Sequence, residues 1–265
     1  MFPELFKVGG LTLHAYGLMI ALGMLFGFEY VIRKARKSGM AQNLAVDLFF
    51  YIVIAGLLGG RVFYVATNWQ LYSQNMLDAF KVWEGGLVFY GGLIFSFIAA
   101  VAFIRVKKMD FWTTADLFAP AIPLAHFFGR LGCLFAGCCY GKECRLPWSV
   151  TFKNPKSLAP LNVPLHPTQA YEAAANLVIF IVLAVLAGKK SSAGKIFLLY
   201  VLMYSAARFG VEFFRGDERG AFILGFSPAQ AISLVFFVCT TAFWLVKYQL
   251  SATKNFNGRA GEHHE

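Results

Sequence analysis

The chain has 265 residues, of which 58% are hydrophobic and only 14% are charged, and its formal net charge is +10. A soluble domain has about a quarter charged residues, so this composition cannot cover a solvated surface and excludes a soluble globular protein. The basic residues form short clusters between apolar runs, which favours contact with anionic lipid headgroups over nucleic-acid binding. We therefore predict an all-α, polytopic transmembrane helix bundle that lies in a lipid bilayer.

Apolar stretches of about 20 residues, long enough to cross a bilayer as a helix, recur along the chain. About seven transmembrane helices are predicted, near Leu13–Ile32, Val46–Ala66, Leu87–Ile104, Ala115–Phe135, Glu172–Leu186, Gly194–Phe214 and Pro228–Val246. The first stretch has only Lys7 as a basic residue before it and is long for a cleaved signal peptide. We therefore expect it to be retained.

Lysine and arginine residues indicate the orientation of these helices. Basic clusters occupy the first, third and fifth links and the C-terminal segment, for example at Arg33, Lys107 and Lys189. Links rich in lysine and arginine face the cytoplasm, so we expect the N-terminus outside and the C-terminus in the cytoplasm. Residues 1–250 then form one membrane domain with an outer loop at about 136–170, and the polar residues 251–265 form a disordered cytoplasmic tail.

Several ionisable residues lie inside the predicted spans, where they are costly and normally face a partner or a cavity. They are Arg61, Arg130, Glu172, Arg208 and Glu212, joined by His14, Asp116 and His126. Three arginines toward the outer ends of their spans suit a phosphate, because guanidinium groups stay charged and donate in a fixed fork. The alternative is a set of interfacial anchors or ion pairs, such as one between Arg208 and Glu212, four residues apart.

Glycine pairs lie close to several of these residues. They are Gly59-Gly60 before Arg61, Gly85-Gly86, Gly91-Gly92 after Tyr90, and Gly129 and Gly132 on either side of Arg130. Glycine lets a backbone approach another helix or a ligand closely. Helix packing is the default explanation for any single pair, whereas glycines beside arginines at the outer boundary favour a site for a lipid headgroup.

The motifs that contain these residues occur in a specific order along nearly the whole chain. They are His14–Met19, Gly59–Arg61, Trp83–Leu87, Tyr90–Ile94, Gly129–Gly132 with Gly137 and Gly141, His166–Glu172 and Arg208–Arg215. This ordered set resembles the prolipoprotein diacylglyceryl transferases, enzymes of the bacterial inner membrane. The resemblance implies a multi-pass protein of that membrane, in which the loop at about 136–170 is periplasmic.

The resemblance also implies a reaction. The diacylglyceryl group of phosphatidylglycerol moves to the thiol of the lipobox cysteine of a preprolipoprotein, a thioether forms, and glycerol phosphate is released. Arg130 and Arg208 are candidates to stabilise the departing phosphate. The thiol must become a thiolate, which is the nucleophile, and Tyr16, Tyr90 and His166 are candidates to assist. No metal or redox cofactor is implied.

The remaining expected site residues bind substrate. They are Arg61, His14, Gly91, Gly92, Gly132, Gly137, Gly141, Gln169, Glu172 and Glu212. His166 and Pro167 also suit the junction between a loop and a helix, since proline is favoured in a first helical turn. A structural role that shapes the site is therefore the first interpretation of His166, and direct catalysis is the second.

Two departures from the family pattern bear on the mechanism. Many members have histidine at the position of Tyr90, and tyrosine, with an ordinary pKa of about 10, is a poor base near neutrality. The family usually has asparagine at the position of Cys133, and often an acidic or amide residue at Cys138. Here Cys133, Cys138, Cys139 and Cys144 form a group that contains four of the five cysteines.

Four interpretations of this cysteine group are open. The first is a structural disulfide that pins the following loop at the outer face, where disulfides persist, and the second is packing by reduced thiols. The third is a metal site, although the spacing differs from the paired C-x2-C pattern of structural zinc sites. The fourth is acyl or redox chemistry in a divergent paralogue that modifies another acceptor.

A membrane transporter of an anionic solute is the rival to a transferase, since it also needs buried arginines and glycines. Many secondary transporters are built from paired internal repeats, and the sequence has no visible repeat.

Overall fold

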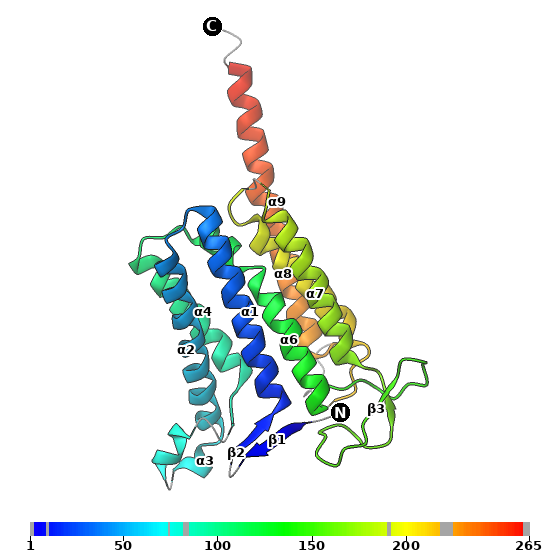
Figure 1. The fold of residues 1–265 in the computed structure, drawn as a ribbon. Coiled ribbons are helices and arrows are strands. Elements are labelled where there is room, and N and C mark those ends of the chain that lie inside the picture. The colour runs from blue at the N-terminus through cyan, green and yellow to red at the C-terminus, as the bar shows by residue number, and fades with distance from the viewer. Residues whose placement is uncertain are drawn as a thin grey trace. The chain divides into compact units, whose positions relative to one another are not determined.

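The computed structural model describes residues 3–8, 11–73, 75–81, 85–189, 192–217 and 225–261. The chain divides into two compact units, whose residues can be followed by the colour bar of Figure 1. Unit 1 contains Met1–Gly27 and Phe118–Glu265, and unit 2 contains Phe28–Leu117. Helix α1 (Ala15–Ser38) begins in unit 1 and ends in unit 2.

Unit 2 is built on the packing of α2 (Gln42–Thr67) against α4 (Phe89–Val106). Between them in the chain lie α3 (Trp69–Tyr72) and the 3-10 helix η1 (Met76–Phe80), and α5 (Phe111–Phe118) follows α4. A Cβ atom at Gly59 would lie 2.5 Å from the carbonyl oxygen of Gly91, and a Cβ atom at Gly91 would lie 2.5 Å from that of Gly59. The two helix backbones therefore touch, which only glycine allows.

This contact predicts that alanine substitution lowers stability more at Gly59 than at the neighbouring Gly60. We expect Gly59→Ala to destabilise the protein by about 1–3 kcal/mol, as overpacking does, because the new methyl group meets helix backbone. Gly60→Ala is the matched control, since its Cβ atom would lie no closer than 3.4 Å to any neighbour. Thermal unfolding of the two purified variants in detergent checks the prediction, and equal melting temperatures would contradict it.

Unit 1 begins with a hairpin of β1 (Glu4–Val8) and β2 (Leu11–His14), followed by the first half of α1. Its other helices are α6 (Ala121–Ala136), α7 (Thr168–Leu186), α8 (Lys195–Glu212) and α9 (Pro228–Gly261). Helix α6 packs against α7, α7 against α8, and α8 against α9. The core between α7 and α8 contains Ile179, Leu183, Ile196 and Tyr200.

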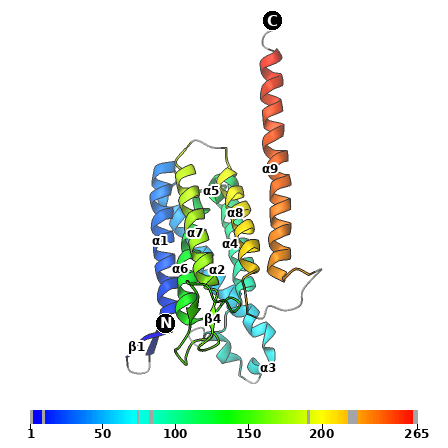
Figure 2. The ribbon, with the colours of Figure 1, turned by 90° about the vertical axis from the view of Figure 1, so that its right-hand side faces the viewer.

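The loop that joins α6 to α7 has a small core of its own. It contains β3 (Val150–Thr151) paired with β4 (Pro164–Leu165), and the buried side chains of Phe152, Ala159 and Leu165 pack together. The loop lies at the same end of unit 1 as the N-terminal hairpin (Figures 1 and 2), where Lys156 forms an ion pair with Glu4. This packed loop follows directly on the end of α6 that carries the candidate site.

The prediction of an all-α, multi-pass membrane protein is confirmed. Among the described residues, six helical segments are long and apolar enough to cross a membrane. They are Ala15–Ser38, Gln42–Thr67, Phe89–Val106, Phe111–Ala136, Thr168–Leu186 and Pro228–Tyr248. Helix α8 occupies the position of the other predicted span, and it carries Lys195, Arg208 and Glu212, which lower its hydropathy. The orientation of the helices stays a prediction.

The structure differs from the prediction at several element boundaries. Leu11–His14 is a strand, so His14 lies outside the first helix instead of inside a span. The predicted span Ala115–Phe135 is interrupted between α5 and α6, where Pro120 precedes the first residue of α6. Helix α9 continues to Gly261 and so includes much of the expected tail at 251–265.

Candidate functional site

Glu172, near the start of α7, is buried and lies between three guanidinium groups. Its Oε2 atom is 2.6 Å from Nε of Arg130, and its Oε1 atom is 2.9 Å from Nη1 of Arg215 and 3.7 Å from Nη1 of Arg208. These arginines come from α6, from the segment after α8 and from α8. A buried carboxylate stays ionised only with such partners, because transferring its charge out of water is costly.

Two further carboxylates complete this group. Glu212 is 2.5 Å from Nη1 of Arg208 through Oε2, and its Oε1 accepts a hydrogen bond of 2.7 Å from Ser227. Asp217 accepts hydrogen bonds of 2.9 and 2.8 Å from Nε and Nη2 of Arg215. Burial raises the pKa of Asp217, although the charge of Arg215 acts in the opposite direction.

We call this group the arginine–carboxylate cluster: Arg130, Glu172, Arg208, Glu212, Arg215 and Asp217. Its three positive and three negative formal charges balance, which explains how it can be buried. Four of its members were predicted from the sequence as site residues, whereas Arg215 and Asp217 were not. The available signal was spacing, because positions 208, 212 and 215 fall on one face of a helix. Ser227 lies in a separate segment and gave no such signal.

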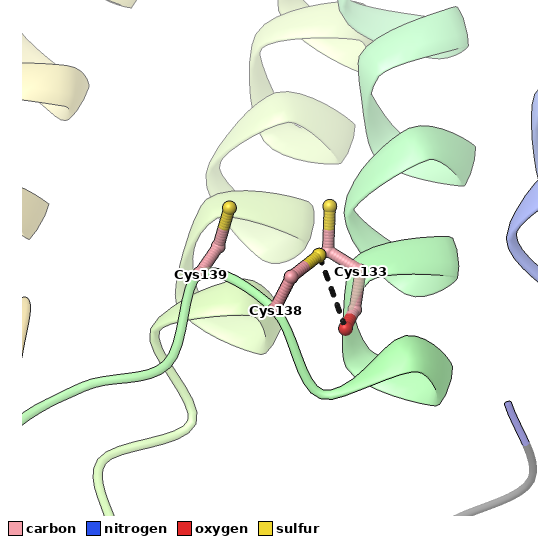
Figure 3. A group of neighbouring side chains, drawn as sticks. All are labelled: Cys133, Cys138 and Cys139. Atoms are coloured by element: carbon pink, nitrogen blue, oxygen red, sulfur yellow. Dashed lines mark hydrogen bonds between the residues drawn. The ribbon is translucent and has the colours of Figure 1, made fainter. Parts of the chain in front are cut away.

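Three cysteine thiols lie beside the cluster, where Arg130 contacts one of them. Cys133 comes from the last turn of α6, whereas Cys138 and Cys139 come from the loop that follows (Figure 3), and the three Sγ atoms lie within 4.8 Å of one another. Nη1 of Arg130 is 3.7 Å from Sγ of Cys139. Hydrogen bonds with the thiols of Cys133 and Cys138, followed by the charges of Arg215 and Arg130, lower the pKa of Cys139. We call Cys133, Cys138 and Cys139 the thiol group.

The first of the four interpretations, a structural disulfide, is wrong for this structure, in which all five cysteines are free. Hydrogen bonds hold the loop instead. The hydroxyl of Thr168 donates to the carbonyl oxygen of Cys139, and Nε2 of Gln169 donates to that of Cys138, both at 2.7 Å. Cys144 is buried elsewhere in the loop, where its N–H donates to the carbonyl oxygen of Pro164 at 3.0 Å.

Tyr16 and His166, two candidates to assist the acceptor thiol, also lie in unit 1. Tyr16 is in the first turn of α1, and a Cβ atom at Gly132 would lie 3.3 Å from its Cα atom. Tyr16 is therefore next to the turn of α6 that precedes Cys133. Nδ1 of His166 is 3.2 Å from the hydroxyl of Tyr171, and its ring packs against Phe214, with ring centroids 5.2 Å apart.

Gly137 and Gly141, predicted to bind substrate, are positions of close approach within the loop. Gly137 ends α6 with a φ of 80°, a left-handed conformation that favours glycine. A Cβ atom there would lie 2.0 Å from Oγ of Ser157, and one at Gly141 would lie 2.5 Å from the carbonyl oxygen of His166. Folding of the loop accounts for both glycines, and their contact with substrate stays a prediction.

The remaining predicted residues belong to unit 2. Arg61 is buried and donates hydrogen bonds of 2.7–3.3 Å to the carbonyl oxygens of Asp78, Ala79, Gly85 and Gly86. These contacts hold Asp78, Ala79, Gly85 and Gly86 against α2. Tyr90, in the first turn of α4, is 54% exposed.

Gly91 and Gly92 lie against α2, so helix packing accounts for both. A cavity of about 550 Å³ in unit 2 is lined by Phe97, Arg105 and Phe111 among others, and its lining includes none of the predicted site residues. The convergence of the unit 2 residues with Arg130 stays a prediction.

The membrane-spanning helices and the buried cluster define a multi-pass membrane protein with a charged site inside its helical unit. The family model for prolipoprotein diacylglyceryl transferase matches residues 3–246, and the chain belongs to this family, which confirms the resemblance. Among similar proteins are the phosphatidylglycerol–prolipoprotein diacylglyceryl transferases of Clostridium tetani, Geobacter sulfurreducens and Synechocystis sp..

The identities to these relatives are 36%, 36% and 32%, in that order. The matches cover 88%, 89% and 93% of this chain and 93%, 91% and 90% of the relatives.

Proposed function

We propose that this protein transfers the diacylglyceryl group of phosphatidylglycerol to the lipobox cysteine thiol of a prolipoprotein. Membership of the family and the names of its relatives support the reaction. The structural observation that supports it best is the meeting of Arg130 and Arg208 on one buried carboxylate, Glu172. A phosphodiester headgroup is an anion, and paired guanidinium groups are suited to hold it.

The two arginines would act on the leaving group. The acceptor thiolate attacks the terminal glyceryl carbon of the diacylglyceryl group, a C–S bond forms, and the C–O bond to the phosphate breaks. The electron pair of that bond stays on the phosphate oxygen of glycerol phosphate, which gains negative charge. Glu172 and Glu212 hold the guanidinium groups in place beforehand, so that little reorganisation is needed when this charge develops.

The proton of the acceptor thiol must leave before or during the attack. Tyr16, Tyr90 and His166 are the candidates to receive or direct it. Phosphatidylglycerol brings its acyl chains from the bilayer, which is consistent with a site carried by membrane-spanning helices. The protein is proposed to lie in the bacterial inner membrane, with its N-terminus outside, its C-terminus in the cytoplasm and the loop at about 136–170 in the periplasm.

A transfer assay tests this function directly. The purified protein is incubated in detergent with phosphatidylglycerol and a lipobox peptide. The mass of the peptide is then measured by mass spectrometry. We expect a gain of one diacylglyceryl group, which is absent when serine replaces the peptide cysteine. Folded protein that gives no product would contradict the proposal, and uptake of an anionic solute into proteoliposomes without transfer would favour a transporter.

A further inference from the structure

We propose that Cys133, Cys138 and Cys139 bind one thiophilic divalent metal ion, such as zinc, and leave a coordination position open for the thiol of the acceptor cysteine. Binding of the ion does not depend on the proposed function, whereas the identity of the ligand at the open position rests on it. Among the described residues, this is the group of histidine, cysteine or acidic side chains whose ligand atoms come close enough to hold a metal ion.

The geometry of the thiol group is near that of a three-coordinate site. Three thiolates at about 2.3 Å from a zinc ion lie about 4 Å from one another in a trigonal arrangement, and the Sγ atoms here lie within 4.8 Å of one another. Small side-chain movements would therefore bring all three sulfurs to an ion. Three protein ligands with a fourth position open is the pattern of catalytic zinc sites.

The backbone around the thiols is held in an uncommon conformation. Cys139 has a φ of 61°, in the left-handed region that residues other than glycine rarely adopt. Its carbonyl oxygen accepts from Thr168 and that of Cys138 accepts from Gln169, so α7 fixes both residues. As a result two adjacent cysteines, together with Cys133, gather their sulfurs in one place (Figure 3). Backbone strain of this kind is concentrated at functional sites.

The charges around the thiol group also suit an ion. A divalent ion with three thiolates carries a net charge of −1, and the guanidinium group of Arg130 is 3.7 Å from Sγ of Cys139. The guanidinium group therefore places a positive charge beside the anionic site. Because Arg130 is also a candidate to hold the phosphate of phosphatidylglycerol, a thiolate on the ion would lie close to the leaving group.

Such an ion would activate the thiol of the acceptor cysteine. A thiol that coordinates a metal ion is deprotonated outright, so its proton passes to water and no base of matched pKa is required. The bound thiolate then forms the C–S bond as the C–O bond breaks, and the electron pair leaves with glycerol phosphate. The thioether product has no negative charge and dissociates from the ion. The ion is neither oxidised nor reduced.

Cobalt(II) is a suitable probe for the thiol group, because thiolate ligands give it a strong and characteristic absorption. The reduced, chelator-treated protein in detergent is titrated with cobalt(II) and then with zinc in competition. We expect one ion per chain. Cys133→Ser, Cys138→Ser and Cys139→Ser should each weaken binding by more than about 100-fold, because loss of an outer-shell partner alone weakens metal sites by about 10- to 100-fold.

Cys144→Ser and Cys239→Ser are the matched controls and should bind as the unaltered protein does. A second measurement needs no variant: zinc should protect three thiols, identified by mass spectrometry as Cys133, Cys138 and Cys139, from alkylation. A protein that binds no ion, equal binding by all five variants, or alkylation unaffected by zinc would overturn the metal site.

The open position is tested with the lipobox peptide. Added to the cobalt(II) protein, the cysteine peptide should change the absorption spectrum and the serine peptide should not. An unchanged spectrum with the cysteine peptide would overturn the open position. Ion binding and peptide ligation without any transfer from phosphatidylglycerol would overturn the proposed function and leave the metal site standing.

Discussion

Replacing Arg130 by lysine is expected to lower the rate of diacylglyceryl transfer by about 100-fold or more, as removal of one preorganised donor does in other enzymes. Lysine keeps the positive charge but not the forked donor, so one side chain can no longer face both Glu172 and a phosphate. The variant should still fold, since Glu172 keeps its contacts with Arg208 and Arg215. Initial rates with phosphatidylglycerol and a lipobox peptide check the prediction.

Arg145→Lys is the matched control, because Arg145 is exposed in the loop that follows α6. Its rate should stay within about twofold of the unaltered protein, as expected for surface substitutions away from a site. If Arg130→Lys also kept its rate while folded, the role of Arg130 in holding the departing phosphate would be refuted. Rates at several lipid concentrations separate weaker binding from slower chemistry.

Glu172→Leu should have the largest effect on stability, about 3–5 kcal/mol, which is the usual cost of removing one partner from a buried ion pair. The change leaves three guanidinium groups close together after the loss of their shared counterion. Among the residues that the structure describes, Glu212 and Asp217 would remain paired with these arginines. Thermal unfolding in detergent, followed by helical circular dichroism and by the amount of protein that remains monodisperse, measures the effect.

Glu143→Gln provides the comparison, because Glu143 is an exposed acidic residue of the same unit. It should unfold at the same temperature as the unaltered protein. Unfolding of Glu172→Leu at that same temperature would show that the carboxylate at the centre of the arginine–carboxylate cluster is not needed to keep the three arginines buried.

Much of the fold follows from hydropathy, because a run of about 20 apolar residues has few stable alternatives to a membrane-spanning helix. The boundaries are less predictable. Leu11–His14 continues the first apolar run, and its residues suit a strand as well as a helix. The interruption before α6 had a visible cause in Pro120, since proline disfavours helical conformation in the preceding residue.

The candidate site was predictable in its charges and less so in its contacts. Buried ionisable residues must find partners, so Arg130, Arg208 and Glu172 were expected to have them, and the structure brings them together. Which atoms meet depends on how α6, α7 and α8 pack. Similarly, the clustering of cysteines in the sequence left four interpretations open, because bonding between their sulfurs depends on distances that spacing alone does not set.

The first turns of α7 support two parts of the site at once. Thr168 and Gln169 hold the loop of Cys138 and Cys139, and Glu172 holds Arg130 and Arg215. A tilt or shift of this helix end would therefore move the sulfur atoms together with Arg130 and Arg215. In the proposed reaction, this short helical segment would set the distance between the thiol group, where the acceptor thiolate binds, and Arg130, which holds the departing phosphate. A lipid and a peptide of different sizes must each fit that distance.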